Sequence, residues 1–315
     1  MPAALEPSLT ALPNPLARYF LAMRPPFLLV SLGSCLVGLA TAYASGIPID
    51  AAKAVVTIVF AMVAQAGANV INDYHDSVSG NDASNTERIF PFTGGSRFIQ
   101  NGVLTEQQTL AFGAALFGAT MAAGLWLMAV SGPELFFLGA AGLGIGWAYS
   151  ATPLRLNSRG WGEACIWVAW MLIAAGADYV QRGTPSALPW IASAGYALLV
   201  TNVLYINQFP DARADAAAGK RHWVVRLGVD RAARLYPAIG LSAYACLIAG
   251  VAARALPATA LVALLALPLT LKAAADLQRY RREVSRLAPA IQATIGAALA
   301  HALLLATGIA ASRWL

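Results

Sequence analysis

The chain has 315 residues, of which 58% are hydrophobic and only 11% are charged. Charged residues make up about a quarter of an ordinary soluble domain, and a soluble globule of this length could not bury so much apolar surface. Intrinsic disorder is excluded as well, because disordered chains are poor in apolar residues and rich in charge. The composition therefore indicates an integral membrane protein.

Nine stretches without Asp, Glu, Lys or Arg follow one another along the chain, and charge is costly at bilayer depth. They are residues 25–49, 54–72, 107–133, 135–154, 164–177, 183–210, 235–253, 255–271 and 287–312. Most have the roughly 17–25 residues of a transmembrane helix, and the shortest does so if Asp178 lies at the interface. Barrel strands would alternate in polarity. The sequence thus predicts an all-α polytopic bundle of nine transmembrane helices, with residues 1–15 as an N-terminal tail and 16–315 as a single domain.

The placement of Lys and Arg predicts the orientation of this bundle. With nine crossings and a cytoplasmic N-terminus, 17 of the 21 Lys and Arg residues fall on the cytoplasmic side. Only Lys53, Arg182, Arg254 and Arg313 fall on the other side, an asymmetry that obeys the positive-inside rule. Because the basic residues are spread over five separate loops, the net charge of +6 reflects topology, and no nucleic-acid partner is expected.

Five of the 15 acidic residues fall in two short clusters, at the cytoplasmic ends of the second and sixth predicted helices. The first cluster contains Asn72, Asp73, Asp76 and Asp82, and the second contains Asp211 and Asp215. Helical spacing places Gln65, Asn69, Asn72 and Asp76 on one face of their helix, and Asn207, Asp211 and Asp215 on one face of theirs. Two such polar faces at the same depth can converge within a bundle.

A divalent cation would relieve the repulsion between carboxylates that converge in this way. The available donors are carboxylate and amide oxygens, which suit Mg²⁺, with Mn²⁺ as an alternative, better than zinc. Mg²⁺ also favours phosphate oxygens, so we expect a phosphorylated substrate to bridge the clusters. Lys220, Arg221 and Arg97 are the nearby cations that could hold its phosphates.

Further motifs accompany the two acidic clusters. They are Arg24-Pro25, Tyr149 with Pro153 four residues later, Gly160-Trp161-Gly162-Glu163, Gly219-Lys220-Arg221 and Val225-Arg226-Leu227-Gly228. Together with the acids, these motifs resemble the UbiA superfamily of intramembrane prenyltransferases over most of the chain. The motifs around Asn207–Asp211 and after Asp215 are most similar to the branch that prenylates 1,4-dihydroxy-2-naphthoate in menaquinone synthesis.

The resemblance implies a fold, a location and a reaction. The fold is a bundle of nine helices around a central cavity, in the bacterial cytoplasmic (inner) membrane, with the active site facing the cytoplasm. The reaction is the Mg²⁺-dependent transfer of a polyprenyl group from an allylic polyprenyl diphosphate to an aromatic acceptor, here 1,4-dihydroxy-2-naphthoate. The partners are therefore the polyprenyl diphosphate, the aromatic acceptor and the lipid bilayer.

It also implies roles for individual residues. Asn72, Asp76, Asp211 and Asp215, with Asp73 and Asp82 as further candidates, would hold the metal. Lys220, Arg221, Arg97 and Arg24 would bind the diphosphate, and Asn69, Asn207 and Arg155 would bind the acceptor. Asp76, Asp211, Asp215 and Tyr149 are the expected catalytic residues; the Tyr149 ring would stabilise the allylic cation, with Tyr74 and Tyr205 as further candidates for this role.

Two alternatives remain open from the sequence. The first is the same chemistry on another acceptor, such as 4-hydroxybenzoate or homogentisate. The second is a secondary transporter, which would place its ionisable groups near the bilayer midplane on broken helices of two matching halves. Here the acids lie at helix ends, which favours the enzyme.

Overall fold

The computed structural model describes residues 5–314, in which the regular secondary structure is helical throughout. The long elements are α2 (Pro25–Ala44), α3 (Ala51–Val78), α5 (Glu106–Ser131), α6 (Leu135–Ser150), α7 (Gly162–Arg182), α8 (Leu188–Ala217), α10 (Val229–Ala252), η2 with α11 (Ala258–Ala266 and Leu267–Tyr280) and α12 (Ala288–Ala311). Within the described residues, eight of these are long and apolar enough to cross a membrane, and α6 is a shorter apolar helix. The predicted all-α polytopic bundle is thus confirmed.

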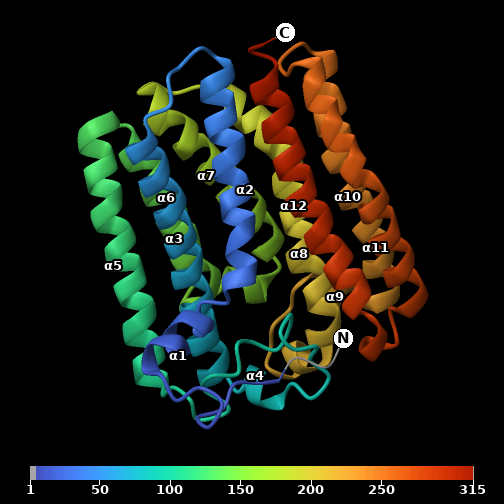
Figure 1. The fold of residues 1–315 in the computed structure, drawn as a ribbon. Coiled ribbons are helices and arrows are strands. Elements are labelled where there is room, and N and C mark those ends of the chain that lie inside the picture. The colour runs from blue at the N-terminus through green and yellow to red at the C-terminus, as the bar shows by residue number, and fades with distance from the viewer. Residues whose placement is uncertain (1–4, 315) are drawn as a thin grey trace.

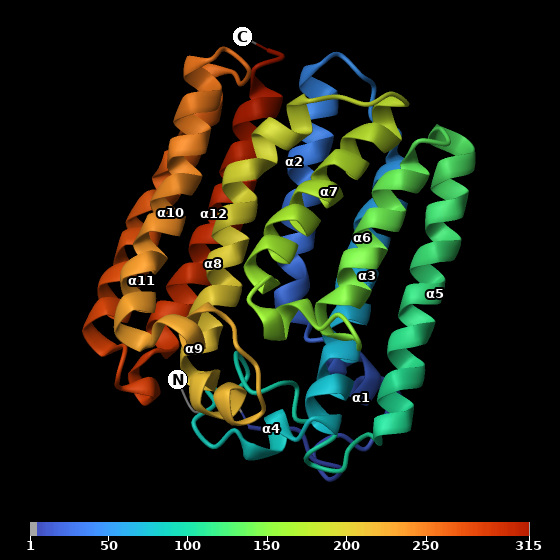
Figure 2. The ribbon, with the colours of Figure 1, turned by 180° about the vertical axis from the view of Figure 1, so that it is seen from behind.

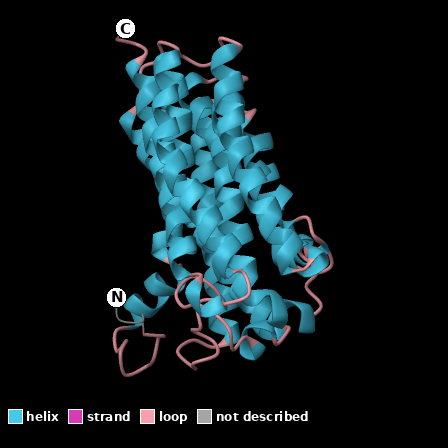
Figure 3. Cartoon of the chain, turned by 90° about the vertical axis from the view of Figure 1, so that its right-hand side faces the viewer, coloured by secondary structure: helices cyan, strands magenta, loops and turns pink. Residues whose placement is uncertain are grey.

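The short elements gather at one end of the bundle. They are α1 (Pro15–Ala22), α4 (Asn81–Ser84), η1 (Leu156–Arg159), α9 (Trp223–Leu227) and η3 (Val284–Arg286). Figures 1 and 2 show α1, α4 and α9 below the long helices, on the side of the N-terminus. Seen from the side, this end carries the longer loops, and the C-terminus lies at the opposite end (Figure 3). Of the expected N-terminal tail, residues 1–4 lie outside the described residues.

Local signals in the sequence set where several helices begin. Pro25 occupies the first turn of α2, where its missing N–H is not needed. Asp50 caps α3 by accepting from the backbone N–H of Lys53, and Thr105 forms a capping box with Gln108 at the start of α5. Each of these signals opens a long helix close to the predicted boundary.

The helices α3 and α8 continue beyond their apolar stretches, and these extensions carry the acidic clusters. The charge-free stretch in α3 ends at residue 72, but the helix runs on to Val78. The charge-free stretch in α8 ends at residue 210, but the helix runs on to Ala217. Asp73, Asp76, Asp211 and Asp215 are therefore held on rigid helix ends, which fixes the direction of their side chains.

Small residues allow the central helices to approach closely. A Cβ atom added at Gly38 of α2 would lie only 2.1 Å from the carbonyl oxygen of Ala174 in α7. Small residues favour such close packing between membrane helices, where no hydrophobic force drives the helices together. On the outer surface, by contrast, large apolar side chains such as Leu265 and Phe137 are exposed, the latter by 71%. This arrangement suits a bundle surrounded by lipid.

One buried ion pair ties α2 to α7 at the end of the bundle far from the acidic clusters. Asp178 is only 1% exposed, and its carboxylate accepts hydrogen bonds from Arg182 at 2.7 and 2.8 Å. The hydroxyl of Thr41 in α2 donates to the same carboxylate at 2.8 Å, and Arg182 also donates to Ser45 at 3.0 Å. Asp178 thus lies between helices, paired with a cation one turn further along α7.

Removing Arg182 should destabilise the bundle more than removing the whole pair. Arg182→Met leaves the buried Asp178 carboxylate without its cation, which should cost about 3 kcal/mol of unfolding free energy. The Asp178→Asn/Arg182→Met double variant removes that uncompensated charge and should recover part of the loss. Thermal unfolding in detergent measures both, and a double variant less stable than Arg182→Met would contradict this account.

Candidate active site

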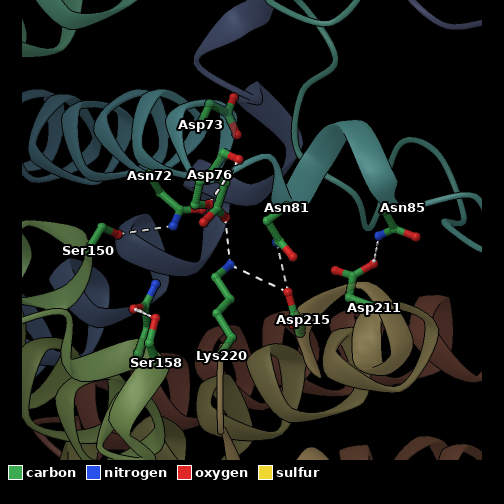
Figure 4. A network of polar contacts seen from close by, with 12 residues as sticks. Asn72, Asp73, Asp76, Asn81, Asn85, Ser150, Ser158, Asp211, Asp215 and Lys220 are labelled. Atoms are coloured by element: carbon green, nitrogen blue, oxygen red, sulfur yellow. Dashed lines mark hydrogen bonds and ion pairs between the residues drawn. The ribbon is translucent and has the colours of Figure 1, made fainter. Parts of the chain in front are cut away.

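The two acidic helix ends meet through one lysine. The ammonium nitrogen of Lys220, just beyond α8, lies 2.7 Å from a carboxylate oxygen of Asp76 in α3 and 3.6 Å from one of Asp215 in α8. All three side chains are buried. Figure 4 shows Lys220 reaching up between the two carboxylates, which come from segments more than 130 residues apart in the chain. The predicted convergence of Asp76 and Asp215 is thus present.

Lys220 keeps its charge because of these two partners. Burial lowers the pKa of a lysine, but the nearby Asp76 and Asp215 carboxylates outweigh burial and hold the pKa of Lys220 above its ordinary value. The side chain therefore acts as a fixed positive charge between the acids. A divalent cation placed between the same carboxylates would take over this role.

Asp215 is held by two residues outside the predicted site. The side-chain amide of Asn81 in α4 donates to one oxygen at 2.8 Å, and the Nε2 atom of His222 lies 2.8 Å from the other. Asn81 directly precedes Asp82 within the first acidic cluster, so its position in the sequence was a usable signal. Residue type and spacing alone gave no comparable signal for His222.

The loop between α3 and α5 covers the remaining acids. The amide of Asn85 donates to Asp211 at 2.6 Å, and the backbone N–H of Gly94 donates to the other oxygen of Asp211 at 3.3 Å. The backbone N–H of Ser96 donates to both oxygens of Asp73 at 3.3 Å. This loop therefore fixes Asp73 and Asp211 on either side of the Lys220 contact, as Figure 4 shows for Asn85 and Asp211.

Asp82 is the least exposed acid of the two clusters. It is 2% exposed, and its Oδ2 atom has no hydrogen-bond partner. Burial, reinforced by the charges of Asp76 and Asp73, raises the pKa of Asp82 to about 8 despite the opposing effect of Lys220. The guanidinium of Arg97 donates to the backbone carbonyl of Asp82 and leaves its carboxylate free.

The donor set fits a hard divalent cation, although the acids are held apart. Within residues 5–314, no three His, Cys, Asp or Glu side chains lie close enough together to form a metal site as they stand. The buried side-chain oxygens Oδ2 of Asp82 and Oδ1 of Asn81 nevertheless lack partners, and the Asp and Asn side chains here offer oxygen atoms of the kind that Mg²⁺ binds. Asp76, Asp82 and Asp215, with Asn81, are the residues best placed to hold such an ion.

An apolar cavity of about 590 Å³ opens beside these acids. At one end it is lined by the polar side chains Arg24, Asn69, Asn72, Tyr149 and Asn207. Elsewhere its walls are mostly apolar side chains of α3, α5, α6 and α7. The family resemblance predicted a central cavity, and the structure contains one.

The cavity is long. Both Tyr149, near the C-terminal end of α6, and Leu135, its first residue, line it, so it follows α6 for about 20 Å at 1.5 Å per residue. Three glycines of α6 line this wall, and a Cβ atom added at Gly139 or Gly142 would meet nothing within 4 Å. This space could hold an extended apolar chain running away from the acidic end.

Three of the polar residues at this end are oriented by hydrogen bonds. Asn72 donates to the hydroxyl of Ser150 at 3.0 Å, and Asn69 donates to the carbonyl of Met23 at 3.3 Å. Arg24 donates to the carbonyl of Phe92 at 3.1 Å and stacks over the Phe27 ring. The Oδ1 atom of Asn207 is buried without a partner. Asn207 thus retains an unsatisfied acceptor at the polar end of the cavity.

Other residues predicted for the site lie further from it. The side chain of Arg221 is exposed, and its backbone carbonyl accepts from Arg226. Arg155 lies in the loop after α6 with a left-handed backbone and does not line the cavity. Tyr205 is fully buried and donates to the carbonyl of Ala232, whereas Tyr74 packs against His75. Among the three tyrosines considered, Tyr149 is therefore the one that faces the cavity.

A group of acids near the polar end of an apolar cavity is the arrangement expected of a membrane-embedded transferase, and comparison with known proteins agrees. Residues 31–310 match the UbiA prenyltransferase family, and the chain belongs to this family. It is 29% identical over 304 residues to the 1,4-dihydroxy-2-naphthoate octaprenyltransferase of Escherichia coli, covering 93% of this chain and 95% of that protein. It is 32% identical over 262 residues to the Mycobacterium tuberculosis protein of the same name, covering 82% and 85%.

The fold is also that of solved relatives. A UbiA homologue from Archaeoglobus fulgidus, in a structure with DMAPP and Mg²⁺, superimposes with a TM-score of 0.59 at 16% identity. The superposition covers 91% of this chain and 99% of that one. At this level of identity the similarity establishes the shared fold. Sequence and structure thus agree that the chain is a UbiA-family prenyltransferase.

Gly95 should be essential because its backbone packs against the Asp82 carboxylate. A Cβ atom at Gly95 would lie 2.2 Å from Oδ2 of Asp82, and the residue has a φ of +73°. Gly95→Ala should therefore displace Asp82 and lower prenyl transfer at least tenfold. Gly102→Ala is the matched control, because Gly102 has a φ of +67° in the same loop but open space around it. Equal activities of the two variants in a turnover assay would refute this role.

Proposed function

We propose that this chain transfers a polyprenyl group from an allylic polyprenyl diphosphate to 1,4-dihydroxy-2-naphthoate, with Mg²⁺, in menaquinone biosynthesis. The observation that carries the proposal is the Lys220 bridge between Asp76 and Asp215 near the polar end of a long apolar cavity. The names of the two relatives given above support this donor and acceptor. The A. fulgidus homologue with DMAPP and Mg²⁺ supports a prenyl diphosphate with a divalent ion.

The acids and the lysine would share the diphosphate end of the donor. Bound Mg²⁺ would neutralise the charge that develops on the leaving diphosphate. Asp76, Asp82 and Asp215, with Asn81 and Asp211, would hold the ion, and Asn72 lies one turn before Asp76 on the same face of α3. Lys220, released from its two carboxylates, would then donate to the phosphate oxygens. Arg24 and Arg97 supply further positive charge around this end.

The cavity would protect and guide the carbon skeleton. Its apolar walls exclude water, which would otherwise quench an allylic cation. The ring of Tyr149 lies at the polar end of the cavity and would stabilise that cation by about 0.5–2 kcal/mol. The prenyl tail would extend along the glycine-lined wall of α6, away from the acids. The reaction at the diphosphate and the binding of the prenyl tail would thus take place at opposite ends of one cavity.

The acceptor would enter from the polar end. Asn69 and Asn207 line the cavity there, and the free Oδ1 of Asn207 could accept a hydrogen bond from an acceptor hydroxyl. The ring carbon that carries the carboxylate would attack C1 of the donor, the C–O bond to the diphosphate would break, and the carboxylate would leave as CO₂. Arg155 remains a candidate partner for that carboxylate before it is lost.

The orientation and location of the enzyme are part of the same proposal. The excess of Lys and Arg on one side of the bundle supports a cytoplasmic N-terminus and an active site that faces the cytoplasm. The bacterial relatives support the cytoplasmic (inner) membrane. We also propose that residues 16–315 act as one domain, since the acidic site combines residues from α3, α4 and the end of α8.

Purified protein with Mg²⁺, a polyprenyl diphosphate and a panel of aromatic acceptors would test this function. We expect a prenylated, decarboxylated product from 1,4-dihydroxy-2-naphthoate and no product in excess EDTA. Preferred turnover of 4-hydroxybenzoate or homogentisate would reassign the acceptor but keep the chemistry. Full activity in EDTA would reject the metal-dependent mechanism. Use of Mn²⁺ in place of Mg²⁺ is tested in the same assay.

Neutral isosteres of the acids should abolish turnover without unfolding the protein. Asp76→Asn and Asp211→Asn each remove a charge from the proposed cation site, and we expect turnover to fall at least 100-fold. Asp276→Asn is the control, because Asp276 pairs with Lys272 in α11 outside the site. Near-normal activity of Asp76→Asn or Asp211→Asn would show that the residue concerned does not hold the metal.

The empty space beside Gly142 should determine which prenyl chains are accepted. Gly142→Leu places a side chain into the cavity and should reduce turnover of long-chain donors far more than that of short ones. Gly118→Leu in α5 is the matched control, because Gly118 also has open space but does not line the cavity. Steady-state kinetics with donors of increasing length measure the effect, and an equal loss for all lengths would contradict it.

A further inference from the structure

His222 lies at the junction between the second acidic cluster and the short helix α9. It is 3% exposed and forms the N-cap of α9, where its Nδ1 atom accepts from the backbone N–H of Val225 at 3.4 Å. On the other side of the ring, its Nε2 atom lies 2.8 Å from Oδ2 of Asp215. The one imidazole therefore links the backbone of α9 to a carboxylate of α8.

These two contacts define which nitrogen carries the proton. Because Nδ1 accepts a hydrogen bond from a backbone N–H, the proton of the neutral ring is on Nε2. Nε2 then donates to Asp215, whose carboxylate can only accept. The backbone of α9 thus fixes the tautomer, and the tautomer fixes the direction of the Asp215 hydrogen bond.

Capping alone does not account for a histidine at this position. Ser, Thr, Asp and Asn are the preferred N-cap residues, since a single oxygen close to the backbone satisfies the free N–H groups. Such a short side chain would not extend to Asp215, whereas the far nitrogen of the imidazole does. A histidine is expected here if both the cap on α9 and the hydrogen bond to Asp215 are needed.

The other contacts of Asp215 show what the histidine adds. Asn81 donates to Oδ1 and the Lys220 ammonium lies 3.6 Å from the same oxygen, so His222 is the partner of Oδ2. If a divalent cation replaced Lys220, Asn81 and His222 would still hold the carboxylate from both sides. The orientation of Asp215 would then be set before the ion arrives.

We propose that His222 is a positioning residue that orients the Asp215 carboxylate for a divalent cation. This inference rests on the proposed function, because it presumes that Asp215 is a metal ligand. Partners that orient a ligand in this way typically change metal affinity about 10–100-fold when they are removed.

Two substitutions separate positioning from capping, because each retains one of the two contacts. His222→Asn keeps an acceptor near the Nδ1 position, and so the cap, but loses the donor to Asp215. His222→Gln places an amide donor near the Nε2 position but loses the cap. Mn²⁺ binding followed by EPR in detergent, with thermal unfolding of each variant, measures the two roles independently of turnover.

We expect His222→Asn to bind Mn²⁺ about 10–100-fold more weakly than the wild type while its unfolding temperature changes little. His222→Gln should bind the ion nearly as well as the wild type, even if α9 is less stable. The reverse pattern, weak binding by His222→Gln and normal binding by His222→Asn, would reduce His222 to a helix cap and overturn the inference. Absence of Mn²⁺ binding by the wild type would instead reject the metal site of the proposed function.

Discussion

Carboxylates that are buried at the end of a helical bundle repel one another, and this constraint shapes the whole acidic end of the protein. Five aspartates share this region, and a cation between them reduces their mutual repulsion. Lys220 provides that cation by contacting both Asp76 and Asp215, which join α3 to the end of α8. The same arrangement can receive a metal–diphosphate complex, because a lysine is easily redirected from carboxylate to phosphate. The electrostatic requirement of the fold and the proposed chemistry thus depend on the same contact.

The apolar cavity provides the space for the apolar part of the substrate. A polyprenyl diphosphate has a charged head and a long apolar tail, and the site offers an acidic end and a cavity about 20 Å long in series. The glycines of α6 leave that space open, whereas the close contact at Gly38 holds α2 against α7 elsewhere. Close packing in one part of the bundle and open space in another therefore follow from where small residues face a neighbouring helix and where they face the cavity.

The sequence alone was sufficient to predict the helices and the main acids. Charge is excluded from the membrane interior, so gaps in charge located all nine elements, and helical spacing placed Asp76 and Asp215 on faces that converge. The sequence did not predict that α6 is short. Nor did it predict that the eighth apolar stretch begins as a 3₁₀ segment and continues as α11 to Tyr280. The contacts of Asn85 and His222 were also beyond its reach, because they depend on how loops fold back over the helix ends.

The central claim is that α3 and α8 jointly hold one divalent cation. Crystals grown with Mn²⁺ and a prenyl diphosphate, measured at the manganese absorption edge, would locate the ion directly by its anomalous scattering. The account predicts a peak between Asp76 of α3 and Asp215 of α8, in contact with the diphosphate and with Lys220 turned toward the phosphates. A peak bound to the acids of one helix only, or a diphosphate bound elsewhere with Lys220 still between Asp76 and Asp215, would contradict it.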